Sequence, residues 1–340
     1  MAKLRIGVLY DYWWDDDEER VEGERPKKKS PDQDVQAVYE ALKKSGHNPV
    51  FVRLDGTAES LIELARSQTD LLFNLVESFG GDDSQDTNIA GYLELLERRF
   101  TGAGSSGLYL AQDKALAKKI FTFHGIHTPY FSTVYRGRTE HSHDIKFPVI
   151  VKPAREDGSI GIQFGAVCDS IKELMERIDY IHAEFDTPAL IEEYIEGREL
   201  YVGVIGNEKP EALPVVELDL SKLPKGTPKI AGAEVKWDED TDAYKQTWPF
   251  LPEDLDETIT QRLRDVAVQA FQALQLRDYG RIDFRLATDG TLHVLEVNPN
   301  PYLLPSAEFC MAARESGRAY SDLIGQLAEL ALARYGNGGG

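Results

Sequence analysis

The sequence predicts an α/β protein that opens with a doubly wound parallel sheet and continues into a small and then a larger α+β unit. Up to Leu75, short apolar runs alternate with amphipathic helical patterns in β-α-β-α-β order, which is typical of a parallel sheet. A chain of 340 residues is long for one core, and a Gly/Ser-rich stretch at 100–107 marks a first boundary. We place the units at 1–105, 106–187 and 188–335, with a frayed tail at 336–340.

Composition narrows the class of protein. An apolar content of 42% and an aromatic content of 10% fit a globular fold. The formal charge of −20 argues against nucleic acid and anionic membranes as partners. Cys168 and Cys310 give neither a disulfide framework nor a zinc spacing. No apolar run has the length of a signal peptide or a membrane span, so we expect a cytoplasmic protein.

Apolar periodicity and turn residues place the N-terminal elements. Residues 15–31 are charged and lack a period, so we expect a mobile loop there. A helix that carries Val35, Val38 and Leu42 on its inner face should stop at Gly46. The other expected elements are strands at 5–10, 50–54 and 71–75, helices over 61–66 and 89–96, and a loop at 80–83.

The rest of the chain mixes strands and helices. A helix should cap the C-terminus, with Ser321 as its N-cap. A helix with Ile259, Leu263 and Val266 on one face interrupts the strand-rich final part. The other expected elements are helices over 114–123 and 170–180, and strands at 147–152, 163–168, 200–205 and 212–218 with a further one from Ala189.

A hairpin near the C-terminus is the most informative pattern. The pair Asp289-Gly290 between two alternating segments predicts a two-residue turn. That turn sets Asp283 opposite Glu296, and Arg281 opposite Asn298 on the same face, because residues two apart share a strand face. The opposite, core-facing side then carries Ile282, Phe284, Leu286, Leu295 and Val297.

The polar face of this hairpin indicates a metal site. Asp283, Glu296 and Asn298 offer hard oxygen ligands, and the guanidinium of Arg281 lies beside them, which suits Mg²⁺ bound to phosphate. The alternative is a cross-strand charge pair on a solvated sheet. Directly opposed carboxylates destabilise a hairpin unless a cation lies between them, so we favour the metal.

Three further segments are ambiguous when taken singly. The loop Asp157-Gly-Ser-Ile-Gly161 has the composition of a phosphate-binding flap, but also of a glycine-rich hairpin turn. Lys152 ends an apolar strand, where it either meets an anion or reaches solvent. The strand that leads into Glu192, Glu193 and Glu199 suits a nucleotide's adenine and ribose, but also fits an edge strand before an acidic turn.

Taken together and in order, these segments resemble the ATP-grasp superfamily, and within it the D-alanine–D-alanine ligase family. The resemblance covers nearly the whole chain. It rests on the six segments that follow, with 101–104 and 311–314 as further points of similarity. They are Lys114, Phe147-Pro-Val-Ile-Val-Lys-Pro153, the Gly158/Gly161 loop, Leu190-Ile-Glu-Glu193, Arg281-Ile-Asp-Phe284 and Leu295-Glu-Val-Asn-Pro299.

The resemblance implies a three-domain ATP-grasp architecture that grips ATP between its second and third domains, and a role for each residue. Lys114 and Lys152 would hold the phosphates, and Asp157 to Gly161, including Gly158, would cover them. Glu192 would meet adenine with Glu193 and Ile195 nearby, and Glu199 the ribose. Lys236 would reach the γ-phosphate, and Ser159 is assigned to catalysis. Asp283, Glu296 and Asn298 would ligate two Mg²⁺, with Mn²⁺ as an alternative, and Arg281 would stabilise the oxyanion.

The resemblance also implies a reaction. ATP would convert a carboxylate to an acyl phosphate, which an amine then attacks, under a lid that we expect at 230–250. The partners would be amino acids or dipeptides, in a homodimer. Two alternatives remain: a genuine D-alanine–D-alanine ligase of cell-wall synthesis, and a non-catalytic nucleotide-binding protein. Retention of Arg281 argues against the second, because ATP binding alone needs no oxyanion donor.

The sequence departs from the family on the side of the amino-acid substrates. Gly158 and Trp237 stand where the family usually has a serine and a tyrosine that bond to each other. Ala307 stands at the family's acceptor-binding serine, with Ser306 one place away. The glutamate that holds the first amino group has no clean match, and Asp32 and Glu77 are the candidates. This pattern predicts the family's reaction on a different substrate.

Overall fold

The computed structural model describes residues 3–12, 32–136, 138–140, 146–156, 158–185, 187–236, 238 and 240–336. The predicted loop at 15–31, the residues Asp157 and Trp237, and the tail after Gly336 lie outside these ranges. Our expectations for them therefore stay predictions, as does the division into units at 105 and 187.

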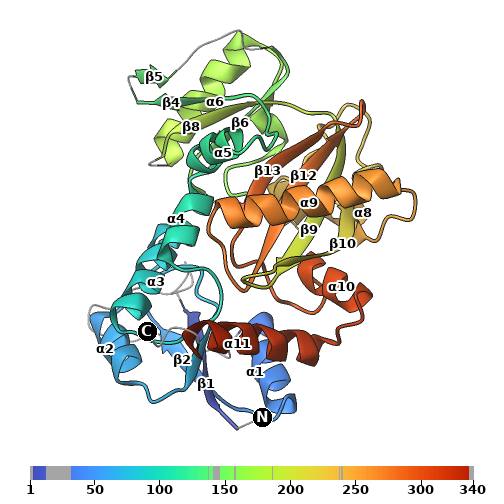
Figure 1. Cartoon of the computed structure of the whole chain (residues 1–340). Helices are drawn as coiled ribbons and strands as arrows, with labels where there is room; N and C mark the ends of the chain where they lie inside the picture. The colour runs from blue at the N-terminus through green and yellow to red at the C-terminus, as the bar shows by residue number, and fades with distance from the viewer. Residues whose placement is uncertain are drawn as a thin grey trace.

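The N-terminal sheet is parallel, with strand order β2-β1-β3, as predicted. Its strands are β1 (Arg5–Asp11), β2 (Asn48–Leu54) and β3 (Leu71–Asn74). Val8 of β1 packs into a core with helix α1 (Gln33–Lys44), whereas Leu9 packs on the other face with α2 (Ala58–Arg66). Helices therefore cover both faces of the sheet. Helix α11 (Tyr320–Gly336) crosses this sheet beside α1 (Figure 1) and shares its core.

Three helices lead from this sheet to the next: α3 (Asp86–Leu95), α4 (Ser105–Gln112) and α5 (Lys114–Phe123). Helix α5 has its predicted bounds, because Asp113 caps it by accepting a hydrogen bond from the Leu116 N–H at 2.9 Å. The Gly/Ser-rich stretch is only partly a loop, because α4 begins within it at Ser105. In Figure 1, α4 and α5 rise from the lower sheet to the upper one.

The central sheet is antiparallel, in the order β5-β4-β8-β6-β7. Helix α6 (Ile171–Glu184) packs on one face through Leu174 and Ile178. The strand expected at 163–168 is mostly wrong, because Phe164–Ala166 is a 3₁₀ turn. The strands are β4 (Phe131–Tyr135), which the sequence analysis missed, β5 (Arg138–Glu140), β6 (Val149–Pro153), β7 (Val167–Cys168) and β8 (Ala189–Glu193).

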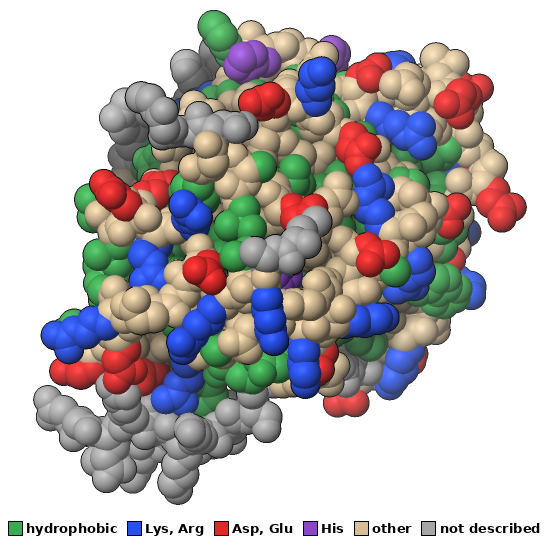
Figure 2. Space-filling model, turned by 60° about the horizontal axis from the view of Figure 1, so that its bottom comes forward, with side chains coloured by type: hydrophobic (Ala, Val, Ile, Leu, Met, Phe, Trp, Pro, Cys, Tyr) green, Lys and Arg blue, Asp and Glu red, His purple; other side chains and the backbone are tan. Residues whose placement is uncertain are grey.

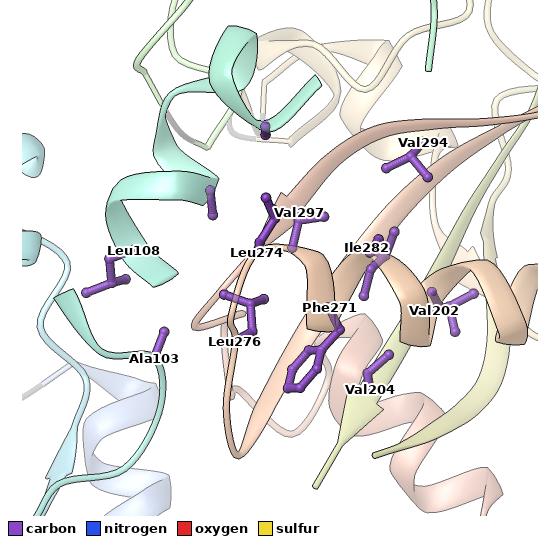
Figure 3. Packing of buried hydrophobic residues seen from close by; sticks show 14 of the residues in the cluster. Ala103, Leu108, Val202, Val204, Phe271, Leu274, Leu276, Ile282, Val294 and Val297 are labelled. Carbon is purple, nitrogen blue, oxygen red and sulfur yellow. The ribbon is translucent and has the colours of Figure 1, made fainter. Parts of the chain in front are cut away.

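The C-terminal sheet carries the hairpin and has the order β11-β10-β9-β12-β13. Helix α9 (Glu257–Ala273) covers one face, where Phe271 packs against Val204 and Ile282 (Figure 3). Helix α10 (Glu308–Glu315) lies on the other face. The strands are β9 (Gly197–Ile205), β10 (Glu211–Leu218), β11 (Pro249–Phe250), β12 (Tyr279–Ala287) and β13 (Leu292–Asn298), and the short helices are α7 (Ala233–Lys236) and α8 (Asp242–Gln246).

The hairpin pairing is confirmed, but the predicted turn is wrong. Arg281 pairs with Asn298 and Asp283 with Glu296, yet Leu286 pairs with Leu292. The turn is therefore one residue longer than predicted, with Gly290 in the left-handed region at φ +82°. A bulge after Asp283 restores the register.

Two side chains from distant parts of the sequence contact β13 at the bulge. Thr128 Oγ1 donates a hydrogen bond to the Val294 carbonyl at 2.9 Å, and Lys118 Nζ donates one to the Leu295 carbonyl at 3.1 Å. The bulge turns Leu295 into a half-buried position, so the prediction that it joins the core is wrong. Val294, which is fully buried, takes that place.

Two smaller observations concern the last helix and the surface. Ser321 lies inside α11 rather than before it, so the predicted cap is wrong. No helix in the described ranges has the length and apolarity to cross a bilayer. On the face drawn in Figure 2, acidic and basic side chains are interspersed, so the net charge of −20 does not form one large acidic field there.

Candidate active site

The polar face of the β12–β13 hairpin forms one connected cluster. Arg281 donates from Nε to Asp283 Oδ1 at 2.7 Å and from Nη2 to Asp283 Oδ2 at 2.9 Å. Asn298 Nδ2 donates to the same Oδ2 at 3.2 Å, and Arg281 Nη1 lies 3.4 Å from Glu308 Oε2. The Arg281 guanidinium also stacks 4.9 Å from the ring centroid of Tyr201. Glu308 and Tyr201 were not among the residues predicted from the sequence.

The two opposed carboxylates differ in how they titrate. Burial raises the pKa of Asp283, the charge of Glu296 adds to this, and Arg281 offsets only part of it. Partial burial also opposes ionisation of Glu296, but the charges of Lys114 and Lys236 outweigh it and hold the pKa of Glu296 below its usual range. A cation between the carboxylates would keep both ionised.

The donor set of this cluster fits a hard divalent cation. No group of three or more His, Cys, Asp or Glu side chains arranged for a metal occurs in the described part of the chain. Mg²⁺ is typically held by one or two carboxylates, with substrate phosphate and water completing its shell. Asp283 and Glu296 supply two carboxylates, and rotation of the Asn298 amide supplies an oxygen. These residues therefore suit Mg²⁺ or Mn²⁺ bound together with a phosphate.

Lys114 joins this cluster to the glycine loop. Its Nζ donates to the Glu156 carbonyl at 2.5 Å and lies 3.7 Å from Glu296 Oε2. The side chain is only 3% exposed. The sequence-predicted phosphate lysine thus lies between the sequence-predicted metal ligand and the loop predicted to cover phosphates.

Glu192 is held between two lysines. Its Oε2 accepts a hydrogen bond from Lys152 Nζ at 3.0 Å, and its Oε1 lies 3.2 Å from Lys118 Nζ. Lys152 therefore meets an anion inside the protein, which decides between the two interpretations of its sequence position. Lys118 was not predicted as a site residue, because in the sequence it is one of several lysines on an amphipathic helix. No local pattern indicates that its side chain crosses to the next sheet.

Both carboxylate oxygens of Glu199 also accept hydrogen bonds. Its Oε2 accepts from Arg285 Nη2 at 2.7 Å, and its Oε1 accepts from the Tyr201 hydroxyl at 2.9 Å. Arg285 was missed, although it follows Arg281 and Asp283 at the same two-residue spacing on β12. Glu193 and Ile195 follow Glu192 at the end of β8, with Glu193 exposed and Ile195 half-buried.

The comparisons with known proteins agree with this geometry. The family model described as the C-terminus of D-ala D-ala ligase matches residues 120–329. A D-alanine–D-alanine ligase of Desulforamulus reducens is 30% identical over 87% of this chain and 92% of its own. The chain belongs to the D-alanine–D-alanine ligase family. It is an ATP-dependent, ADP-forming ligase with the ATP-grasp fold.

Other relatives and solved structures extend the comparison. An uncharacterised protein, y4sG, of Sinorhizobium fredii is 34% identical over 89% of this chain and 88% of its own. The D-alanine–D-alanine ligase of Bacillus anthracis, solved in complex with ATP, matches with a TM-score of 0.70 at 20% identity. The match covers 99% of this chain and 100% of that one. At this identity the structural match establishes the fold.

The glycine loop of this ligase is tied to its neighbouring segment. Ser159 is nearly buried with φ at +66°, and its Oγ donates to the Ala231 carbonyl at 2.8 Å. The Ala233 N–H donates to the Ile162 carbonyl at 2.8 Å. Lys236, at the end of α7, is close enough to influence both Asp283 and Glu296. The loop and the predicted lid are therefore already in contact.

Two glycines allow this loop conformation. Gly158 and Gly161 have φ values of +61° and +68°, which favour glycine. A Cβ on Gly161 would lie 2.7 Å from Pro153 Cγ and 2.9 Å from Phe185 Cζ. The backbone therefore needs glycine at Gly161 for two separate reasons.

Among the described residues, no side-chain hydrogen bond indicates a role for the candidates on the amino-acid side. Ala307 is the N-cap of α10 and contributes no side-chain hydrogen bond to it. Ser306 is exposed. Asp32 precedes α1 and makes no side-chain cap either, whereas Glu77 lines a pocket near Tyr302.

Proposed function

We propose that this ligase joins the carboxylate of one amino acid to the amine of another amino acid or dipeptide, and that its substrates are not two D-alanines. The observation that carries the ligase chemistry is the position of Lys114, between Glu296 and the carbonyl of Glu156. The hairpin and the phosphate loop therefore lie on two sides of the Lys114 ammonium group. A triphosphate in that place meets cations on the loop side and oxygen ligands on the hairpin side.

The chemistry runs in two steps. A substrate carboxylate oxygen attacks the γ-phosphorus of ATP, the bond to ADP breaks, and an acyl phosphate forms. The amine nitrogen of the second substrate attacks the acyl carbon, and the oxyanion collapses as inorganic phosphate leaves and the nitrogen loses its proton. We assign Arg281 to this step, where its guanidinium would stabilise the oxyanion.

The chain's own side chains would divide the remaining work. Lys114 and Lys152 would hold phosphate oxygens, and Lys236 would approach the γ-phosphate from α7. Asp283, Glu296 and Asn298 would hold two Mg²⁺, which neutralise the charge that develops on the phosphates. For the nucleotide we assign Glu192, Glu193, Ile195 and Glu199, with Gly158, Ser159 and Gly161 of the loop over the phosphates.

The proposal of a different substrate rests on the departures from the family. Ala307 has no hydroxyl for an acceptor carboxylate, and Ser306 is exposed. Gly158 has no side chain to bond to a lid residue. These changes lie on the side of the amino acids, whereas the nucleotide side is kept. The cytoplasmic location expected from the sequence and the homodimer implied by the resemblance stay predictions.

A pooled amino-acid screen tests the function. The protein is incubated with ATP, Mg²⁺ and pools of L- and D-amino acids, and released phosphate and new product masses are measured. We expect phosphate release only with particular amino acids, together with a product whose mass is their sum less one water. A clear preference for D-alanine in both positions would instead assign the activity that the relatives' names carry. No amino-acid-dependent phosphate release would leave a nucleotide-binding protein.

A further inference from the structure

A small pocket, partly open to solvent, adjoins the hairpin. Tyr279 lines it from β12, two residues before Arg281 and therefore on the same sheet face. Tyr302 and Leu303 line it from the segment that follows Asn298. The pocket thus opens beside the cluster to which we assign the chemistry, on the side toward the N-terminal sheet.

The floor of the pocket carries two polar side chains, Asp34 and Asn74, that lack part of their possible hydrogen bonds or counter-charge within the described part of the chain. Asp34, at the start of α1, is 8% exposed, and its carboxylate is bonded by backbone N–H groups at the start of the helix and by no described side chain. Asn74, at the end of β3, is 2% exposed. Its Oδ1 accepts from the Val76 N–H at 3.3 Å, whereas its Nδ2 has no hydrogen-bond partner among the described residues. Buried polar groups are ordinarily paired, so the free Asn74 amide nitrogen indicates a ligand in the pocket, and the Asp34 carboxylate beside it has no counter-charge among the described residues that line the pocket.

The mouth of the pocket adds a second carboxylate, that of Glu77. Desolvation and the charges of Asp11 and Asp34 raise the pKa of Glu77 to about 7, although its side chain is open to solvent. Asp11 is itself satisfied, because it accepts hydrogen bonds from the Ser78 hydroxyl and the Glu77 N–H. None of the described residues that line the pocket is a lysine, arginine or histidine.

We propose that this pocket binds a cationic side chain of one amino-acid substrate, so that the ligase favours a basic amino acid over a neutral one of the same length. Asp34 pairs with the ammonium group on the floor, and Glu77 pairs with cationic charge at the mouth. A neutral amino acid carries only its α-ammonium group, so it would leave one of these two carboxylates without a counter-charge. An unpaired charge is unfavourable where the carboxylate is as buried as that of Asp34. The inference rests on the proposed amino-acid ligase function.

Matched pairs of amino acids test the inference. The ATP-dependent kcat/KM is measured for lysine against norleucine and for ornithine against norvaline, in both configurations and with each pooled second substrate. We expect the basic member to be favoured about tenfold or more, as one charge-assisted contact provides. Asp34→Asn and Glu77→Gln should each reduce the preference for the basic over the neutral member, measured as the ratio of their kcat/KM values, about tenfold.

Controls separate folding, binding and function. Glu59→Gln removes an exposed carboxylate from α2 and should leave the preference intact. Thermal unfolding of Asp34→Asn and Glu77→Gln reports whether each variant folds. Calorimetric binding of lysine and norleucine, with a non-hydrolysable ATP analogue and Mg²⁺ present, should show the same preference without turnover.

The outcomes are distinct. Turnover or binding of norleucine equal to or better than lysine would overturn the cationic pocket and leave the ligase function standing. A preference for lysine that survives both Asp34→Asn and Glu77→Gln would place the cation elsewhere and also overturn it. The absence of phosphate release with every amino acid would overturn the proposed function and this inference with it.

Discussion

Lys118 Nζ lies 3.2 Å from Glu192 Oε1, and both side chains are only 1% exposed. Lys118 also donates to Thr128 Oγ1 at 2.7 Å and to the Leu295 carbonyl at 3.1 Å. Leu295 immediately precedes Glu296. One buried ammonium therefore joins the glutamate assigned to adenine to the strand that carries a proposed metal ligand.

We expect Lys118→Met to weaken both stability and nucleotide binding. Burial lowers the pKa of Lys118 and Glu192 offsets part of this, so the pKa is about 8 and the ammonium remains the main form at neutral pH. Breaking a buried ion pair by removing one partner costs about 3–5 kcal/mol. Urea denaturation should report a loss of this order, and calorimetry should report a higher Kd for ATP.

Lys119→Met is the matched control, because Lys119 is the next residue of α5 and is exposed. It should change the free energy of unfolding by no more than about 0.5 kcal/mol. Equal effects of the two variants would show that the buried contact to Glu192 has no special role.

Arg281 and Arg285 lie on one face of β12. We expect substitution of Arg281 to affect mainly catalysis and substitution of Arg285 to affect mainly nucleotide binding. Arg281 contacts Asp283, whereas Arg285 contacts Glu199. Arg281→Lys loses the planar donor for the oxyanion, so we expect kcat to fall about 100-fold or more. Arg285→Lys loosens Glu199, so we expect the Kd for ATP to rise about tenfold with a smaller effect on kcat.

Single-turnover kinetics and nucleotide titration of both variants make this comparison. If Arg281→Lys abolishes ATP binding, the guanidinium belongs to the nucleotide site and the assignment to the oxyanion is wrong.

The metal assignment predicts an absolute need for a divalent cation. EDTA should abolish amino-acid-dependent phosphate release, and added Mg²⁺ or Mn²⁺ should restore it. Glu296→Gln should raise the Mg²⁺ concentration for half-maximal rate by about 10–100-fold, because one charged ligand is lost. Asp289→Asn, in the exposed turn of the same hairpin, is the control and should leave that concentration unchanged. Full activity in EDTA would remove the metal from the proposal.

Much of the hairpin was predictable from the sequence because strand alternation is local information. Arg281 opposite Asn298 and Asp283 opposite Glu296 follow from the turn position and a period of two. The turn length was wrong, and the pairing survived because the bulge at Leu295 compensates. That bulge is tied to Lys118 and Thr128, which are distant in sequence, so no local pattern indicated it.

The same distinction explains what was missed in the site. The environment of Lys152 was ambiguous from the sequence, because its partner Glu192 comes from another strand of the sheet. Arg285 repeats the spacing of Arg281 and Asp283 and was within reach of the sequence analysis. Asp34 was not, because its role in a pocket arises only when α1 packs near the segment after β13.

The raised pKa of Glu77 gives a prediction for stability against pH. The unfolded chain releases the Glu77 proton near pH 4.5, whereas the folded protein holds it up to about pH 7. The folded state therefore binds more protons within this window, and the free energy of unfolding should fall as pH rises through it. Solvent screening makes the effect modest, because the side chain is exposed.

Urea midpoints from pH 4 to 8 measure this slope. Glu77→Gln should reduce the slope, whereas Glu59→Gln should retain it. An unchanged slope in Glu77→Gln would mean that Asp34 and Asp11 do not crowd Glu77 as the structure indicates.

Gly161 gives the sharpest test of the phosphate loop, because Gly165 offers a control four residues away. A Cβ on Gly161 meets Pro153 and Phe185 at under 3 Å, and φ is +68°, whereas a Cβ on Gly165 meets nothing within 4 Å. We expect Gly161→Ala to destabilise the loop by about 1–3 kcal/mol. Because the loop is proposed to cover the phosphates, the Kd for ATP should rise and kcat should fall, while Gly165→Ala stays close to the parent protein. If Gly161→Ala binds ATP and turns over normally, this loop is a structural turn and the phosphates are held elsewhere.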